Sequence, residues 1–172
     1  VGVFRTSITP PAVVLQANHV TAAMHGFSSI EQIINIPVKN LYFNPEDRKV
    51  FTKEIIEQDK VKNKLIRMKK TTGEPFWASI TASCHFDQSG KPEWIDGIIE
   101  DVTEKKEIED KLSGYLKFFE TLVNTIENPV FYKDFKYHYQ GCNKVYSNLI
   151  FGLPPEKIIN KTVYDFTGSL PD

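Results

Sequence analysis

The chain has 172 residues, of which 41% are hydrophobic and 25% are charged, a composition that argues against wholesale disorder and fits one or two globular domains. The 21 basic residues are balanced by 22 acidic ones, so charge gives no reason to expect nucleic acid or an anionic membrane as a partner. No apolar run approaches the ~18 residues of a membrane-spanning helix, and two cysteines are too few for a disulfide framework and fit a reducing cytoplasm.

The first segment predicts a β-hairpin followed by a short helix. Two β-branched runs, residues 1–6 and 12–18, are separated by a Thr-Pro-Pro turn. Asn18 can begin a helix, because its side-chain oxygen can accept an N–H group of the first turn. Gly26 suits the left-handed conformation that ends many helices, so we expect this helix to stop there.

Two further helices are expected before the sequence pattern changes. One covers residues 28–34 and ends before Pro37, and the next begins near Pro45 with acidic residues in its first turn. The apolar residues of this third helix fall on one stripe that we expect to be buried: Val50, Phe51, Ile55 and Ile56.

Three strands complete the predicted domain. Residues 61–70 form a lysine-rich run, which we interpret as an edge strand, and residues 93–102 form the last strand. Between them, residues 76–86 alternate, with one face formed by Phe76, Ala78, Ile80, Ala82, Cys84 and Phe86. The order of two strands, three short helices and three strands predicts an α+β domain with one antiparallel five-stranded sheet and helices on one face.

A helix of about 25 residues is predicted from Thr103. Its apolar residues are spaced alternately by four and three, as in a heptad seam: Ile108, Leu112, Tyr115, Phe119, Leu122 and Ile126. Two interpretations stay open. The helix either packs on its own domain or pairs with a second copy as a parallel coiled coil, and in both cases it is a rigid connector.

The opening pattern of the chain returns after this helix. Asn143 and Gly152 correspond to Asn18 and Gly26, and the apolar-acidic run 156–160 corresponds to 31–35. The second copy has no counterpart of residues 45–102, and the chain begins at Val1 inside an apolar run, so we interpret it as a piece of a longer protein. We expect residues 128–172 to be poorly ordered alone or to borrow partners from a neighbouring molecule.

Residues 1–112 resemble a PAS domain with its C-terminal PAC-type segment. The resemblance depends on motifs in a fixed order: the Val-Phe-Arg-Thr opening with Asn18 after it, Gly-Phe-Ser at 26–28, Thr-Gly-Glu-Pro-Phe-Trp at 72–77, and Gly-Ile-Ile-Glu-Asp-Val-Thr-Glu at 97–104. Residues 128–166 are similar to the start of a second PAS domain. We therefore divide the chain into a PAS/PAC domain (1–102), a signalling helix (103–127) and part of a second PAS domain (128–172).

The resemblance implies a sensory input module of a signalling protein. Tandem PAS domains joined by a helix are similar to the input half of sensor histidine kinases in two-component phosphorelays, or of diguanylate cyclases. It implies a cytoplasmic homodimer whose helix carries a conformational signal to an output kinase or cyclase domain, without nucleic acid or membrane contact in this segment. The alternative is a small-molecule or cofactor-binding receptor domain, and the third is an enzyme with an undetected active site.

The resemblance also implies that Asp101 and Thr103 couple the last strand to the helix. Independently of the family, Thr103 stands where it can cap that helix. The predicted interior could enclose a small-ligand pocket lined by Phe43, Phe51, Ile55, Ala78, Ile80 and Ala82. Our expectation is a packed core without a cofactor, and a bound small ligand is the alternative.

No catalytic or metal-binding pattern stands out. Cys84 and His85 are adjacent on a strand and therefore point to opposite faces, so they cannot form a nucleophile–base pair. Haem is not expected, because residues 46–60, the helix that often carries the ligand in similar domains, contain no histidine; the alternative is His25 or His85 as an atypical ligand. Flavin is not expected either, because the Asn-Cys-Arg context of light-sensing relatives is absent.

Overall fold

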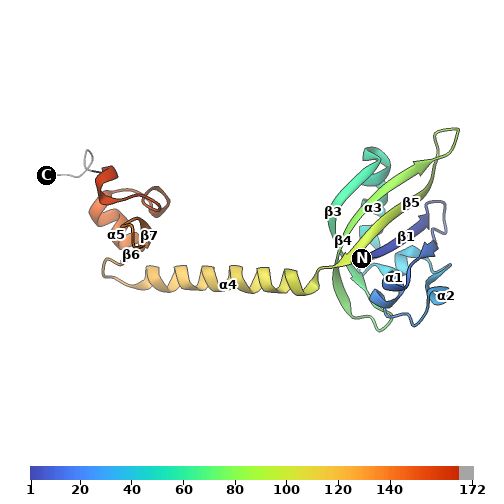
Figure 1. The fold of residues 1–172 in the computed structure, drawn as a ribbon, viewed down its shortest axis with the longest axis horizontal. Coiled ribbons are helices and arrows are strands. Elements are labelled where there is room, and N and C mark those ends of the chain that lie inside the picture. The colour runs from blue at the N-terminus through green and yellow to red at the C-terminus, as the bar shows by residue number, and fades with distance from the viewer. Residues whose placement is uncertain (167–172) are drawn as a thin grey trace. The chain divides into compact units, whose positions relative to one another are not determined.

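The computed structural model describes residues 1–166 and divides the chain into two compact units. The first unit is Val1–Ile108 and the second begins at Glu109 (Figure 1). Each unit has its own hydrophobic core.

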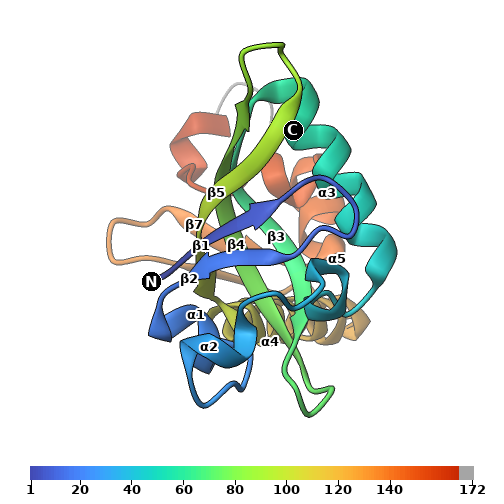
Figure 2. The same ribbon diagram turned by 90° about the vertical axis from the view of Figure 1, so that its right-hand side faces the viewer.

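The first unit is built on a five-stranded antiparallel sheet. The strands are β1 (Gly2–Ser7), β2 (Val14–Ala17), β3 (Lys60–Lys69), β4 (Pro75–Phe86) and β5 (Pro92–Asp101). They lie side by side in the order β2-β1-β5-β4-β3 (Figure 2), and every neighbouring pair is antiparallel. The predicted α+β fold with one antiparallel sheet is confirmed, and the lysine-rich β3 is an edge strand.

The alternation predicted for β4 holds along almost the whole strand. The even-numbered side chains from Phe76 to Cys84 are buried, while the odd-numbered ones are half-buried. Phe86 is the exception, with 39% of its surface exposed. The β4–β5 register shifts between His85 and Phe86, so the last residue of the strand no longer follows the alternation.

Four short helical segments connect β2 to β3. They are α1 (His19–Met24), α2 (Ile30–Ile33), the 3₁₀ turn η1 (Val38–Leu41), which was not predicted, and α3 (Pro45–Gln58). The Asn18 side chain accepts the N–H of Thr21 at 2.9 Å and caps α1, as its residue type predicts.

The buried stripe of α3 differs from the predicted one. Phe51 and Ile55 are buried and Ile56 is half-buried, but Val50 is 62% exposed. The third inward residue is Arg48, which is only 7% exposed. Positions 48, 51 and 55 are spaced by three and four and share one helix face, whereas Val50 lies about 100° away from Phe51.

The second unit contains most of a long helix and a small core. The helix α4 (Thr103–Thr125) begins in the first unit and is followed by the hairpin β6 (Phe131–Lys133) and β7 (Tyr139–Cys142). Short helical segments complete the described part: α5 (Lys144–Tyr146), η2 (Ser147–Phe151), η3 (Pro155–Lys157) and η4 (Val163–Phe166). The core of this unit consists of Tyr139, Tyr146, Ile158 and Phe166.

The second unit repeats hydrogen bonds of the first. The Asn18 side chain accepts N–H groups from β1 and from α1, at 3.0 and 2.9 Å, and Asn143 accepts equivalent bonds at 3.0 and 2.9 Å. Asn35 and Asn160 each have a φ of 63° and each donate a backbone N–H to the second strand of their hairpin. The sequence correspondence is therefore accompanied by a correspondence in local geometry.

Candidate functional site

The junction between the sheet and α4 is held by three hydrogen bonds. The Val102 N–H donates to the carbonyl oxygen of Trp77 at 2.8 Å, and the Trp77 N–H donates to the Thr103 hydroxyl at 2.9 Å. The N–H of Thr103 donates to the Asp101 carboxylate at 2.9 Å. Because Trp77 lies in β4, the start of the helix is bonded to a strand that is distant in sequence.

Thr103 does not occupy the position that the sequence predicted for it. It is the first helical residue rather than the cap, and its hydroxyl bonds to β4 instead of to the first turn of α4. The Asp101 carboxylate accepts the N–H of Thr103, the first N–H of the helix, and the carbonyl of Val102 accepts the N–H of Lys106 at 2.8 Å. Asp101 and Thr103 are thus brought together, with Thr103 facing the sheet.

The apolar seam of α4 is exposed along its length. None of the helix residues is buried in the described chain. The six predicted seam residues are exposed by 41–70%: Ile108, Leu112, Tyr115, Phe119, Leu122 and Ile126.

The predicted interior pocket is largely filled by its own side chains. Five of the six residues are buried with at most 3% of their surface exposed: Phe51, Ile55, Ala78, Ile80 and Ala82. What remains is a cavity of about 30 Å³ lined by residues of the sheet, α1 and α3. Phe43 was expected here but is 44% exposed and lies elsewhere.

Polar atoms without partners gather at this cavity. In the described chain four buried side-chain N or O atoms have no hydrogen-bond partner, and three belong to cavity-lining residues: Thr6 Oγ1, His25 Nε2 and Arg48 Nη2. The other ring nitrogen of His25, Nδ1, lies 3.0 Å from the carbonyl of Thr21. From the sequence, Thr6 and Arg48 had no expected role and His25 was considered only as an atypical haem ligand, although the 48-51-55 spacing puts Arg48 on the inner face of α3.

Burial changes the ionisation of the residues around the cavity. Desolvation lowers the pKa of His25 and is opposed by the hydrogen bond to Thr21. Burial raises the pKa of the Tyr42 phenol, and the positive charge of Arg48 opposes that effect. The neutral forms of His25 and Tyr42 are therefore favoured, while Arg48 keeps its charge because a guanidinium does not lose its proton in proteins.

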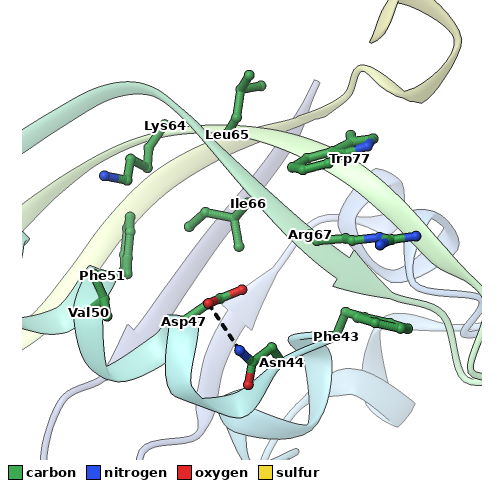
Figure 3. A pocket seen from close by; sticks show the side chains of 10 residues that line it. All are labelled: Phe43, Asn44, Asp47, Val50, Phe51, Lys64, Leu65, Ile66, Arg67 and Trp77. Atoms are coloured by element: carbon green, nitrogen blue, oxygen red, sulfur yellow. Dashed lines mark hydrogen bonds between the residues drawn. The ribbon is translucent and has the colours of Figure 1, made fainter. Parts of the chain in front are cut away.

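Phe43 belongs to an outer groove between α3 and β3 rather than to the interior. This groove has a volume of about 360 Å³, and Figure 3 shows its lining side chains. The Arg67 guanidinium lies 4.8 Å from the ring centre of Phe43 and 6.0 Å from that of Trp77. Val50 and Leu65 are exposed on the same surface, so the groove is mostly apolar, with Arg67 stacked on its aromatic rings. Its polar lining residues are Asn44, Asp47 and Lys64.

The cysteine and histidine of β4 point to opposite faces, as predicted. Cys84 is buried, and desolvation raises the pKa of its thiol, which opposes the thiolate that nucleophilic chemistry needs. His85 stacks on Trp94 with 5.4 Å between ring centres. Within residues 1–166, no three His, Cys, Asp or Glu side chains gather where they could hold a metal ion.

Comparison with known proteins gave a family and a set of similar folds. The family model of the PAS domain matches residues 2–104. The chain is similar to the PAS domain of a protein from Colwellia psychrerythraea, with 24% identity and a TM-score of 0.51 over 60% of this chain and 86% of that chain. Comparison with curated proteins gave no match.

Two further solved structures share the fold. A sensory box histidine kinase/response regulator from Burkholderia thailandensis has 18% identity and a TM-score of 0.55, over 70% of this chain and 90% of that chain. A light-oxygen-voltage domain from a flavin-analogue study has 14% identity and a TM-score of 0.51, over 70% of this chain and 87% of that chain. At these identities the likeness extends to the fold alone.

The interior as folded does not fit a flavin. A cavity of about 30 Å³ is roughly a tenth of the ~300 Å³ at which small-molecule sites begin. Tyr42, Phe51 and Met68 are buried around it and leave no room for a three-ring system. Separately, no helix in the described part of the chain is long and apolar enough to cross a membrane.

Proposed function

The chain belongs to the PAS domain family, a family of sensory modules, and on that premise we propose that its first domain passes a conformational signal into α4. The observation that supports this most directly is the set of bonds from Trp77 to Val102 and Thr103. A helix whose first residues are bonded to β4, an inner strand of the sheet, follows small movements of that strand. A preference of a few kcal/mol between two states is enough to switch an output.

The exposed seam supports dimerisation through α4. Monomeric proteins rarely expose long contiguous apolar patches, and the alternating spacing of this seam is that of a two-stranded coiled coil. We therefore favour a parallel homodimer, in which a tilt or rotation of both helices reaches the next domain. The proposed output is a kinase of the histidine kinase type, or a cyclase, in the cytoplasm.

The repeated hydrogen bonds support the proposal that residues 128–172 begin a second PAS unit. The asparagine that caps the first helix and the asparagine with a positive φ recur in equivalent places. In such an arrangement α4 connects two sensory modules rather than a module and a catalytic domain.

A second candidate function is that of a small-molecule receptor. It is favoured by the unpartnered polar atoms at the interior cavity, which a packed structural core does not need. The two functions are compatible, because a ligand can supply the signal that the helix carries.

The coupling is tested by replacing Thr103 with valine, which has the same shape but cannot accept the Trp77 N–H. An unpaired N–H at a partly buried site costs about 1–3 kcal/mol, so we expect hydrogen exchange of the Trp77 amide to become ~5- to 150-fold faster. Exchange at the start of α4 should rise with it. The measurement is amide exchange followed by NMR on the 172-residue chain.

Thr121→Val is the matched control. The Thr121 hydroxyl bonds only within α4, to the carbonyl of Lys117 at 2.8 Å. Exchange at Trp77 should not change in this variant. Equal exchange at Trp77 in wild type and Thr103→Val would contradict the proposed coupling.

A further inference from the structure

The interior cavity contains a positive charge with no counter-charge. Arg48 is 7% exposed and takes part in none of the ion pairs found among residues 1–166. Its Nη2 atom has no hydrogen-bond partner. Burying a charge is costly unless it is paired, and Arg48 cannot relieve that cost by losing a proton.

Two further polar side chains at the cavity, Thr6 and His25, could contact a molecule that pairs with Arg48. Thr6 and His25 are 3% and 1% exposed, and Thr6 Oγ1 and His25 Nε2 have no partner. Three polar side chains around one cavity, all more than nine-tenths buried and each with one unpartnered atom, indicate a site for a polar molecule. The remaining lining residues are almost all apolar and include Ile33, Met68 and Ile99.

We propose that this cavity binds a small planar oxyanion, held by the Arg48 guanidinium and the Thr6 hydroxyl and accompanied by a proton on His25 Nε2. The guanidinium is a planar fork of N–H donors that matches two oxygen atoms of an oxyanion. This inference rests on the second candidate function, that of a small-molecule receptor, and names the class of ligand; the proposed transmission through α4 does not depend on it.

The size of the cavity limits the anion to very few atoms. One water molecule needs roughly 10–15 Å³ of this kind of space, so a cavity of about 30 Å³ holds about two such volumes. Formate and nitrite, each with three non-hydrogen atoms, match this size and share the two-oxygen edge. Acetate carries an additional methyl group that the packed wall would have to accommodate.

The proton on His25 follows from how its ring is held. Nδ1 lies beside a carbonyl oxygen, the Thr21 carbonyl, and therefore carries the hydrogen in the neutral ring. Nε2 then presents a lone pair, which repels an anion until it is protonated. Arg48 and Tyr42 are the other ionisable side chains lining the cavity, and neither supplies this proton at neutral pH. Binding of one anion therefore takes up one proton from solvent.

The proposal is tested by titrating the 172-residue chain with formate and with nitrite at constant ionic strength, observing the side-chain NMR signals of His25 and Arg48. We expect saturable shifts of both signals with at least one of the two anions, and the two titrations distinguish a carboxylate from a nitrogen oxyanion. Acetate should bind at least ~10-fold more weakly. Affinity should be up to ~10-fold tighter at pH 6.5 than at pH 7.5, since one proton is taken up.

Two variants and a control separate the site from general salt effects. Arg48→Met should abolish saturable binding, while Arg67→Met, which removes an exposed arginine of the outer groove, should leave it unchanged. Thr6→Val keeps the side-chain shape and removes the hydroxyl, so it should weaken binding about tenfold or more. If Arg48→Met does not fold, the anion affinity of Thr6→Val alone tests the proposed site.

A folded wild-type chain that shows no saturable response to formate or nitrite would overturn the proposal and leave water as the only occupant. Affinity that is unchanged in Thr6→Val and in folded Arg48→Met would overturn it as well. Binding without any change at the Trp77 and Thr103 amides would leave the anion site standing and count against its coupling to α4.

Discussion

His25 makes the stability of the first domain depend on pH. Its side chain is buried, and desolvation lowers its pKa below the 6.5 of a free histidine. The unfolded chain therefore binds the proton more readily than the folded one. The stability contributed by neutral His25 is present above about pH 6.5 and is lost as the pH falls through the folded-state pKa.

We expect the free energy of unfolding to decrease between pH 7 and pH 5, by at most about 1.4 kcal/mol per pH unit from this residue. His25→Gln should flatten the dependence, because the titrating group is gone. Urea denaturation at several pH values, in buffers free of small carboxylates, measures it. His19→Gln, at an exposed position of the same helix, is the control and should keep the wild-type slope.

At the scale of single residues, the sequence predicted the buried apolar residues better than the buried polar ones. The alternation of β4 predicted Ala78, Ile80 and Ala82 correctly, because a strand has only two faces. On α3 the prediction took every apolar residue as inward, so Val50 was wrong and Arg48 was overlooked. Helix spacing alone favoured Arg48, but a charged residue is rarely assigned to a buried face.

Among the elements, α4 has the clearest consequence for assembly. Its seam is exposed in the single chain, and two such seams facing each other would bury one another. Leu112 lies on the seam and is 57% exposed, whereas Leu116, which is 61% exposed, lies beside it. The two leucines differ in position on the helix rather than in chemistry or exposure.

Leu112→Asp should weaken dimerisation at least ~100-fold, since it places a charge in the apolar interface at a cost of about 3 kcal/mol or more. Leu116→Asp should weaken it less than ~10-fold. Sedimentation equilibrium of the two variants and of wild type gives the dissociation constants. A wild-type chain that stays monomeric at high concentration, or equal losses in both variants, would rule out this seam.

The elements themselves were largely predictable, and their contacts less so. The hairpin, the two following helices, α3 and the three later strands were expected near their observed positions, because turn residues and periodicity mark them. The bond of the Thr103 hydroxyl to Trp77 was not predicted, since it joins positions that only the assembled sheet brings together. The sequence could place a polar residue at the junction but could not identify its partner.

At the scale of the molecule, the two units differ in the size of their cores. In the described chain the first unit has 18 buried core residues and the second has four. Stability is not uniform along such a chain, and a unit with little buried apolar surface opens more often. The similar local geometry of the two units allows this difference to be measured without comparing unlike hydrogen bonds.

The backbone N–H of Val14 bonds to Ile36 at 3.1 Å, and the equivalent N–H of Tyr139 bonds to Lys161 at 2.8 Å. We expect the Tyr139 amide to exchange at least ~100-fold faster, because its unit is held by the smaller core. The amide of Asn160 should likewise exchange faster than the equivalent amide of Asn35. Equally slow exchange in both units of a dilute monomer would contradict the expectation that residues 128–172 are poorly ordered alone.

The neighbouring residues Phe76 and Trp77 give the first domain a very short mechanical path. The Phe76 ring meets the His25 ring edge-on, with 5.2 Å between centres, and the next residue carries both backbone bonds to the start of α4. Only the peptide unit between Phe76 and Trp77 separates the ring contact with His25 from the residue that is bonded to the start of α4. The rigidity of this one backbone unit, rather than a series of intermediate residues, would then determine how much of a displacement at His25 reaches the start of α4.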